Sequence, residues 1–308
     1  MNILILGGNG YLGSKIVKEL LDRGNFVVCT TRAQSDLSRI AELQDSIKRI
    51  PASTEAVETA MQFFKFDYVL NMICNYGQNT CLNNNVLKAN LEFPLEILNL
   101  SVACGVKNFL TIGTGLPDSF NMYSYAKKQF NEFGKFYADK YGINFQSLLL
   151  EMFYGGDEPL NRFLPSVIKK MLMQEDVKTT VGTQHRDIIC VQDVLRAILL
   201  VMQANLNNYH EIPVGTGVAP TIAEIIDYIW EKTDRKSAVY KGAIPMRKDE
   251  PDCVADTSIL SSLGKWQPLN WKDGVYKMIM DMKKLLCGGG VKLLINQLVR
   301  LHFVGGAV

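Results

Sequence analysis

Short apolar runs alternate with stretches of helical periodicity along the first half of the chain. The run "NILIL" (2–6) ends at glycine, which is typical of a buried strand, and residues 11–25 carry apolar side chains at the spacing of an amphipathic helix. Two further helices are predicted at about 90–104 and 122–141. The other predicted strands are "FVVCTTR", "FDYVLNMIC", "KNFLTIGT", "NFQSLLLEMFY" and, more weakly, "DSIKRIPA". This alternation predicts an α/β fold with a doubly wound parallel sheet.

The alternation of predicted strands and helices changes after about residue 155. Short helices, "RFLPSVIKKMLM" and "TIAEIIDYIWEKT", alternate there with short strands such as "EIPVG" and "SAVYKG". Residues 1–155 are therefore expected to form the domain with the parallel sheet, to which the chain returns at about 181–205. Residues 156–285 are expected to form mainly a smaller α/β lobe, and residues 286–308 an amphipathic tail.

Composition narrows the class of protein. The 308 residues, 47% hydrophobic and 21% charged, fit one large or two modest globular domains. A net charge of +2 gives no reason to expect a nucleic-acid partner. The seven cysteines show no metal-ligand spacing, so no metal site is predicted. The N-terminus lacks the pattern of a signal peptide and no apolar run is long enough to span a membrane, which favours a cytoplasmic protein.

A glycine motif, G-x-x-G-x-x-G, lies between the first strand and the first helix. Such a turn lets the backbone approach a pyrophosphate closely, at the positive end of the helix dipole. In this strand–loop–helix context the motif predicts a Rossmann-type dinucleotide site, and a glycine-rich turn without a ligand is the alternative. The residues predicted to bind the cofactor here are Gly7, Asn9, Gly10, Tyr11, Leu12 and Gly13.

The end of the second strand favours one dinucleotide over the other. An acid at this point would bind the ribose of NAD, but the strand ends "CTTR" and no acid follows until Asp36. Thr31 and Arg32 suit a 2′-phosphate, because a guanidinium binds phosphate in a bidentate manner. NADP, as NADPH, is therefore expected rather than NAD. The alternative is that Arg32 is a solvated surface residue.

The stretch "NMYSYAKKQF" contains a tyrosine and a lysine at the spacing of one helical face. Tyr123 and Lys127 are four residues apart, and an ammonium close to a phenol lowers the phenol pKa. Thr114 ends the preceding strand, at the sheet edge where ligands bind, and its hydroxyl can hydrogen-bond a substrate oxygen. Tyr123, Lys127 and Thr114 are the predicted catalytic residues. The alternative is an ordinary amphipathic helix.

Together these features resemble the extended short-chain dehydrogenase/reductases, the NAD-dependent epimerase/dehydratase family, which mostly act on nucleotide sugars. The resemblance covers about residues 1–285. It rests on the glycine motif, "KANLEFPL" with Asn90, "FLTIGT", "YSYAK", "MFYGG", "HRDIICVQD" and "VADTSILSSLGKWQPL". The segments "CNYGQNT", "FNEFGKFYADKYGINF", "RDIICVQDV" and "PVGTGVAPTIAEI" are similar to the CDP-abequose/CDP-paratose synthase type of 4-ketoreductase.

The resemblance implies a role for each candidate residue. Tyr123 would exchange a proton with a sugar oxygen, Lys127 would bind the nicotinamide ribose and lower the Tyr123 pKa, and Thr114 would steady the reacting oxygen. The substrate-binding residues that it implies are Asn75, Tyr76, Arg186 and Arg247, the two arginines as clamps for the pyrophosphate. The structural alternative for the arginines is a salt bridge, with Asp187 as the obvious partner of Arg186.

Departures from the family pattern reduce the number of reactions that we expect the chain to catalyse. Dehydratases follow the catalytic threonine with Asp-Glu, whereas Gly115 and Leu116 stand here, and 4-epimerases carry an acid after the second strand. The expected activity is therefore NADPH-dependent reduction of the 4-keto group of a nucleotide-linked deoxysugar, for surface-polysaccharide biosynthesis. A nucleotide-sugar 4-epimerase is the alternative, and a non-catalytic NADP-binding regulator is the alternative of another class.

Three further expectations follow from the resemblance and the pattern. Only residues 115–122 separate Thr114 from Tyr123, fewer than in most relatives, which predicts a pocket open on that side. The helices at about 90–104 and 122–141 would supply a four-helix interface in a homodimer. The tail could contact a membrane surface, a partner subunit or its own domain.

Overall fold

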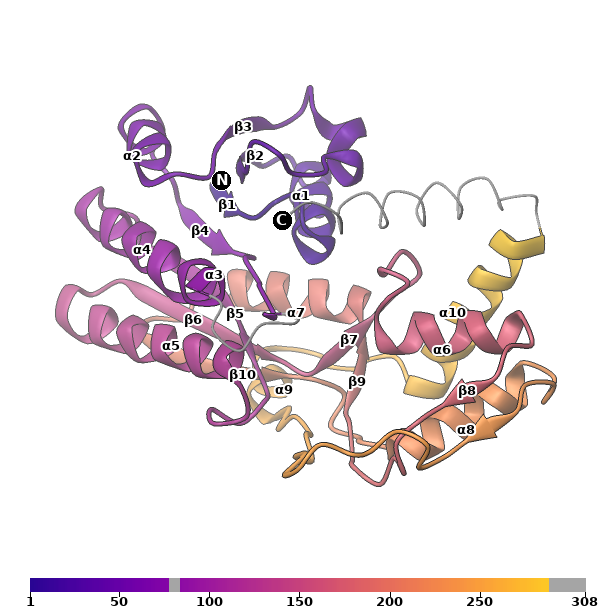
Figure 1. Ribbon diagram of the computed structural model, residues 1–308. Coiled ribbons are helices and arrows are strands. Elements are labelled where there is room, and N and C mark those ends of the chain that lie inside the picture. Colours follow the sequence, from indigo (N-terminus) through magenta and orange to yellow (C-terminus); the bar gives the residue numbers. More distant parts are fainter. Residues whose placement is uncertain (78–83, 288–308) are drawn as a thin grey trace. The chain divides into compact units, whose positions relative to one another are not determined.

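The computed structural model describes residues 1–77 and 84–287, which form two compact units (Figure 1). The first unit comprises Met1–Phe153, Asp187–Ala219 and Pro251–Pro268. The second unit comprises Tyr154–Arg186, Pro220–Glu250 and the described residues from Leu269 onward. The expected tail lies, from residue 288 on, outside the described residues.

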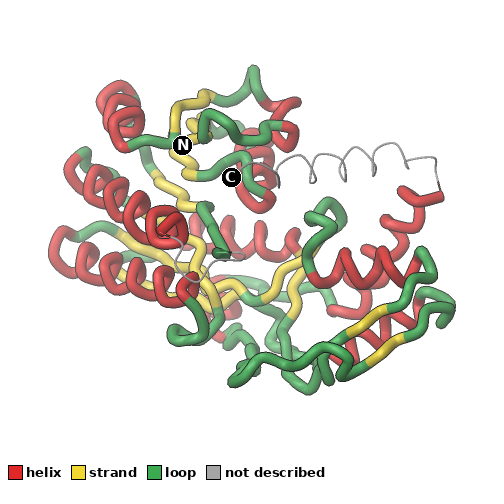
Figure 2. Tube along the Cα trace, viewed as in Figure 1, coloured by secondary structure: helices red, strands yellow, loops and turns green. Residues whose placement is uncertain are grey.

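A seven-stranded parallel sheet forms the centre of the first unit, in the order β10-β6-β5-β4-β1-β2-β3, and the predicted doubly wound fold is confirmed. Its strands are β1 (Asn2–Leu6), β2 (Phe26–Thr31), β3 (Lys48–Pro51), β4 (Tyr68–Asn71), β5 (Asn108–Thr114), β6 (Asn144–Leu150) and β10 (Tyr209–Val214). Helices cover both faces of this sheet (Figure 2).

The alternation of side chains along β1 shows why both faces are covered. Ile3 and Ile5 pack into one core, and Leu4 and Leu6 pack into the other, and all four are fully buried. The first core also contains side chains of α1 (Tyr11–Asp22), η1 (Ser38–Leu43), α7 (Val191–Ala204) and α9 (Ser258–Leu263). The second contains side chains of α2 (Thr54–Phe63), α4 (Phe93–Ala103) and α5 (Met122–Tyr141).

Two strands differ from the sequence expectation. The single strand expected from "NFQSLLLEMFY" is divided into β6 and β7 (Met152–Tyr154), and β7 pairs with β9 (Ile188–Cys190) in a separate two-stranded sheet. The segment "EIPV", expected in the smaller lobe, lies in β10 and pairs in parallel with β6. A short apolar run is consistent with a buried strand in either place, because its partner is fixed by long-range packing.

Helix α5 is defined by strong signals at both ends. Asn121 and Ser124 form a reciprocal capping box, in which the Asn121 side chain accepts from the Ser124 backbone N–H at 2.8 Å. Gly142 ends the helix with a φ of 69°, in the left-handed region that favours glycine. These signals fix the helix at the residues that the sequence predicted.

The described part of the second unit contains three longer helices and one short strand pair. Its elements are α6 (Phe163–Leu172), β8 (Val177–Lys178), α8 (Ile222–Lys232), β11 (Val239–Tyr240) and α10 (Trp271–Cys287). Helix α8 begins at a second capping box, formed by Thr221 and Glu224. Across both units, no described helix combines the length and the apolar character that crossing a membrane requires.

Candidate active site

The glycine loop joins β1 to α1 through a turn that leaves no room for side chains. A Cβ placed on Gly13 would lie 2.2 Å from the Gly7 carbonyl oxygen, and Gly7 itself has a φ of +76°. A Cβ on Gly8 would lie 2.7 Å from the Cys29 sulfur of β2. Gly10, the residue before α1, has no side chain to cap the helix, so the first N–H groups of a 12-residue helix face the carboxyl edge of the sheet. This arrangement can hold a pyrophosphate.

The end of β2 supports the loop and presents two of the predicted cofactor residues. Thr30 is buried, and its hydroxyl accepts a hydrogen bond from the Gly7 N–H at 3.2 Å. Thr31 is half-buried and Arg32 is exposed. Asn9 donates to the Asp36 carbonyl oxygen at 3.1 Å, which joins the glycine loop to the segment after β2. Their cofactor-binding roles stay a prediction.

Tyr123, Lys127 and Thr114 lie together where β5 ends and α5 begins. The Tyr123 side chain is buried and shares a hydrogen bond with the Thr114 hydroxyl. Lys127 is 2% exposed, and its Nζ donates to the carbonyl oxygens of Ile73 and Ile112, at 2.8 Å each. The predicted i, i+4 pair is thus placed against the sheet edge.

Burial is the largest cause of the pKa shifts of Tyr123 and Lys127. It raises the pKa of Tyr123 well above its usual value, neighbouring Cys74 and Tyr76 add to the rise, and the hydrogen bond with Thr114 opposes it. Burial also lowers the pKa of Lys127 to about 8. The pKa of Tyr123 is thus raised and not lowered as the sequence led us to expect, and burial of the phenol is the largest cause.

The loop after β4 brings two more side chains to Tyr123. The Tyr76 ring lies with its centroid 4.9 Å from that of Tyr123, and Cys74 is hydrogen-bonded to Tyr123. Asn90 is fully buried in a π-helical turn, η2 (Lys88–Glu92), between α3 (Asn84–Leu87) and α4. Its amide donates to the Asn75 carbonyl at 2.8 Å and accepts from the Asn75 N–H at 3.2 Å, which fixes this loop.

Cys74 is the site residue that the sequence reasoning missed. The spacing of the cysteines gives no candidate site in the sequence, but Cys74 is exposed and lies shortly after β4, which ends at Asn71. Its position as the last residue of a predicted strand, directly before the predicted substrate residues Asn75 and Tyr76, was the signal that could have identified it.

The short connection from Thr114 to Tyr123 borders a cavity. The Thr114 hydroxyl accepts from the Leu116 N–H at 3.2 Å, and the Ser124 hydroxyl donates to the Asp118 carbonyl at 3.1 Å. A cavity of about 300 Å³ adjoins these residues, within the first unit. It is lined by Thr114–Asp118, Ser124, Lys127, Lys128, Asn131, Leu149 and Glu211.

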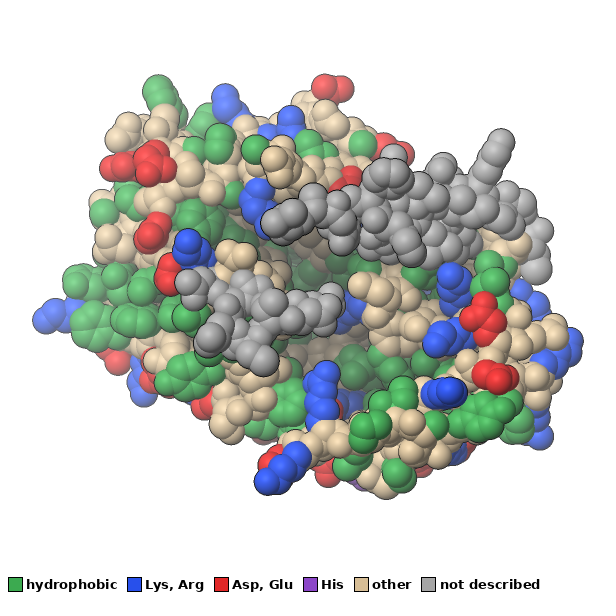
Figure 3. Space-filling model, viewed as in Figure 1, with side chains coloured by type: hydrophobic (Ala, Val, Ile, Leu, Met, Phe, Trp, Pro, Cys, Tyr) green, Lys and Arg blue, Asp and Glu red, His purple; other side chains and the backbone are tan. Residues whose placement is uncertain are grey.

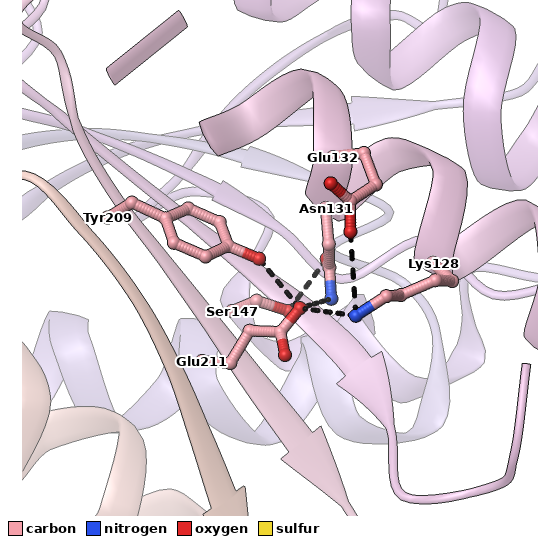
Figure 4. A network of polar contacts seen from close by, with 6 residues as sticks. All are labelled: Lys128, Asn131, Glu132, Ser147, Tyr209 and Glu211. Atoms are coloured by element: carbon pink, nitrogen blue, oxygen red, sulfur yellow. Dashed lines mark hydrogen bonds and ion pairs between the residues drawn. The ribbon is translucent and has the colours of Figure 1, made fainter. Parts of the chain in front are cut away.

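A polar network at the end of this cavity holds α5 on the sheet (Figure 4). Glu211 of β10 accepts from Tyr209 at 2.6 Å, from Asn131 at 3.1 Å and from Lys128 at 3.3 Å. Asn131 in turn accepts from the Ser147 hydroxyl of β6 at 2.9 Å. Two strands therefore anchor the helix that carries Tyr123 and Lys127.

Arg186 and Arg247 belong to the second unit. Arg186 is buried and forms an ion pair with Glu250 at 2.5 Å, whereas Arg247 is exposed. The structure gives Arg186 a different acidic partner from the Asp187 that the structural alternative named. Asp187 accepts instead from the Thr216 N–H and hydroxyl, and from the N–H groups of Gly217 and Ala255.

Comparison with known proteins gives this geometry a context. The model of the "NAD dependent epimerase/dehydratase family" matches residues 3–215. "CDP-abequose synthase" of Salmonella muenchen is 27% identical over 286 residues, which cover 90% of this chain and 96% of that protein.

Two solved structures share the fold. UDP-glucose 4-epimerase of Thermotoga maritima, determined with UDP-glucose, superposes with a TM-score of 0.81 at 23% identity and covers 93% of this chain and 100% of its own. The Thermus thermophilus UDP-glucose 4-epimerase, in complex with NAD, superposes with a TM-score of 0.78 at 21% identity and covers 91% and 98%.

The position of Cys74 predicts selective inactivation by alkylation. With iodoacetamide at neutral pH we expect adducts on the exposed Cys74 and Cys104 and none on Cys29, which is fully buried and whose pKa burial raises to about 12. Of these two adducts, the one on Cys74 would lie beside Tyr123, so turnover should fall with its formation. Peptide mass spectrometry locates the adducts.

Matched variants separate the two exposed thiols. Cys74→Ala should resist inactivation, and Cys104→Ala should be inactivated like the parent protein. Equal resistance of both variants, or inactivation without a Cys74 adduct, would contradict this assignment.

Proposed function

Because the chain belongs to the NAD dependent epimerase/dehydratase family, we propose that it is an NADPH-dependent oxidoreductase that reduces the 4-keto group of a nucleotide-linked deoxysugar. The observation that carries the proposal is the Tyr123 hydroxyl, hydrogen-bonded to Thr114 and one helical turn from the buried ammonium of Lys127. The similarity to CDP-abequose synthase supports a CDP-linked 3,6-dideoxyhexose as substrate and a role in surface-polysaccharide biosynthesis.

The proposed reaction needs a proton donor and a stabilised oxygen from this chain. The glycine loop would hold the pyrophosphate of the cofactor, whose nicotinamide would supply the hydride. Tyr123 gives its phenolic proton to the sugar oxygen as negative charge develops there, and Thr114 hydrogen-bonds the same oxygen. Lys127 binds the nicotinamide ribose and offsets the negative charge left on Tyr123.

The raised pKa of Tyr123 suits reduction. A phenol whose pKa lies well above its usual value stays protonated at neutral pH, so Tyr123 already carries the proton that it donates when the keto substrate binds. An alkoxide is a much stronger base than a phenolate, so proton transfer to the developing alkoxide remains favourable. The reverse reaction would require Tyr123 to act as a base, which the same burial disfavours.

Four side chains are proposed to recognise the substrate. Asn75 and Tyr76 would contact the sugar, because Tyr76 packs on Tyr123 itself. Arg186 and Arg247 would bind the pyrophosphate, since a guanidinium can present two parallel N–H groups to phosphate. Because Arg186 is paired with Glu250, the phosphate would share this arginine with the carboxylate or displace it.

A nucleotide-sugar 4-epimerase is the second candidate, favoured by the fold similarity to UDP-glucose 4-epimerases. An epimerase returns its hydride to the sugar, so it interconverts two sugars without net consumption of cofactor. A non-catalytic NADP-binding regulator would have no need of Tyr123, Lys127 and Thr114 in one place. Net oxidation of NADPH by a 4-keto nucleotide sugar separates the proposed reductase from both.

A homodimer formed through α4 and α5 is part of the proposal. Apolar side chains are exposed along one face of α5, at Met122, Tyr125, Phe133 and Phe136. Hydrophobic atoms gather over the side of the molecule where these two helices lie, whereas charged groups of both signs are interspersed on much of the rest of this view (Figure 3). Exposed apolar area of this kind marks an interaction surface.

The first test replaces the proposed proton donor. Tyr123→Phe should lower the rate of NADPH oxidation by CDP-linked 4-keto-3,6-dideoxyglucose by roughly 100- to 10,000-fold, the usual contribution of a general acid. NADPH binding should change little, because the ring remains. Tyr125→Phe, on the exposed side of the same helix, is the control and should behave like the parent. An active Tyr123→Phe variant would refute the mechanism.

The second test uses the pKa of Lys127. This pKa is about 8, so the ammonium is present below that pH and is lost above it. We expect log kcat/KM to fall as the pH rises through about 8, since the proposed role requires the charge. In Lys127→Arg the residual activity should lose this limb, because a guanidinium stays charged. An unchanged limb in Lys127→Arg would assign the titration to another group.

The third test concerns the dimer. Phe136→Glu places a charge within the exposed apolar face of α5 and should convert the protein from dimer to monomer in light scattering after gel filtration. Lys135→Glu alters the charge one residue earlier, on a different side of the helix, and should leave the dimer intact. A monomeric parent protein would contradict the proposed interface.

A further inference from the structure

The carboxyl group of Glu151 fills the space beside Gly115, the residue that directly follows Thr114. A Cβ placed on Gly115 would lie 2.7 Å from the Glu151 carboxyl carbon and 3.0 Å from its Oε2. The three heavy atoms nearest to that Cβ all belong to this carboxyl group. Because Gly115 has no side chain, an acidic group from another strand lies next to the residue that follows Thr114.

The pairing of β5 with β6 brings these residues together. Thr114 and Leu150 are partners in the parallel register, and the Gly115 N–H donates to the Leu150 carbonyl oxygen at 2.9 Å. On the other side, the Glu151 N–H donates to the carbonyl oxygen of Val214 in β10 at 3.1 Å. The backbone of Glu151 is therefore held between two neighbouring strands, and the sheet sets the position of its side chain.

The Glu151 side chain lies on the face of the sheet that borders the cavity. Side chains alternate along an extended chain, so Glu151 is on the same side as Leu149, two residues earlier. Leu149, Thr114 and Gly115 all line the cavity of about 300 Å³. Glu151 is half-buried, so its carboxyl group is partly shielded from water and remains accessible to a ligand.

We propose that Glu151 binds a ring hydroxyl of the sugar whose keto oxygen is bound by Thr114 and Tyr123. An ionised carboxylate only accepts hydrogen bonds, so it requires a donor on the substrate, and a sugar hydroxyl is such a donor. A CDP-linked 4-keto-3,6-dideoxyhexose carries one free hydroxyl on its ring, at C2. Glu151 is thus assigned to the C2 hydroxyl, and this role rests on the substrate in the proposed function.

Such a carboxylate would select for the hydroxyl. A sugar that lacks the C2 hydroxyl would cover the Glu151 carboxylate without giving it a hydrogen bond, and a site built to bind a hydroxyl rejects an analogue that lacks it. Thr114 and Tyr123 do not make this distinction, because both are proposed to act on the keto oxygen. Glu151 would therefore be a specificity determinant in addition to the proposed catalytic residues.

Removal of the hydroxyl and removal of the carboxylate should have effects that are not additive. For the parent, replacing CDP-linked 4-keto-3,6-dideoxyglucose by the analogue without the C2 hydroxyl should lower kcat/KM for NADPH oxidation by about 10- to 100-fold, since a hydrogen bond to a charged group is lost. In Glu151→Ala the same change of substrate should cost less than about threefold. A purely structural role of Glu151 would lower the activity with both sugars and leave their ratio as in the parent.

Gly115→Ala tests the same contact from the neighbouring strand. Gly115 is not among the described glycines with positive φ, so alanine suits its backbone, and the new Cβ would displace the Glu151 carboxyl group. This variant should also lose most of the preference for the hydroxyl. Glu19→Gln changes a glutamate in the last turn of α1 that pairs with Arg23, and this control should keep the preference of the parent. Circular dichroism melting checks that each variant is folded.

The role of Glu151 and the proposed function are distinguished by the parent and the Glu151→Ala variant. If the parent prefers the sugar with the hydroxyl and Glu151→Ala keeps the full preference, Glu151 has no such role and the proposed reaction stands. Equal activity of the parent with both sugars would also overturn the role of Glu151 and leave the reaction intact. If the parent oxidises NADPH with neither sugar, the proposed substrate is wrong and the role of Glu151 is overturned with it.

Discussion

The burial of the Lys127 ammonium is the constraint on which the candidate site depends. A buried ammonium is costly unless its N–H groups are satisfied, and here the carbonyl oxygens of Ile73 and Ile112 satisfy two of them. Ile112 belongs to β5 and Ile73 follows β4, so one side chain ties α5 to two strands at their carboxyl ends. The helix has little freedom to rotate about its axis while both hydrogen bonds are kept. Tyr123, one turn earlier, is thereby placed beside Thr114.

Contacts further along α5 hold the helix in the same position. Further along the helix, Asn131 joins the network around Glu211, and Phe130 packs edge-on against Phe109 and Phe145. Polar anchoring on one side and aromatic packing on the other fix the helix against β5, β6 and β10, because neither contact tolerates a turn of the helix. The same packing explains the protonation states: the surroundings that hold Tyr123 and Lys127 rigidly also exclude the water that would otherwise solvate their charged forms.

The sequence predicts the parts of this structure that depend on local pattern. The strands of the sheet, the glycine loop and the bounds of α5 follow from periodicity, caps and turns, and the i, i+4 spacing predicts the pair of Tyr123 and Lys127. Local sequence pattern does not predict features that depend on contacts between distant segments. Three contacts join residues that are far apart in the chain. They are the pairing of β10 with β6, the ion pair of Arg186 with Glu250 and the contact of Cys74 with Tyr123. The raised pKa of Tyr123 depends on burial by several elements, so spacing alone gave the wrong direction.

The two ends of the proposed cofactor site point to the same chemistry. At one end, Arg32 directly follows β2, at the place where an acid would suit a ribose diol, and this favours the NADP that we propose. At the other end, Tyr123 is held protonated, which suits a donor to a reduced carbonyl more than a base that must also take a proton away. An epimerase requires a cofactor that stays bound and a tyrosine that works in both directions. A reductase requires only that each turnover begins with reduced cofactor and a protonated phenol, and the described residues meet the second requirement directly.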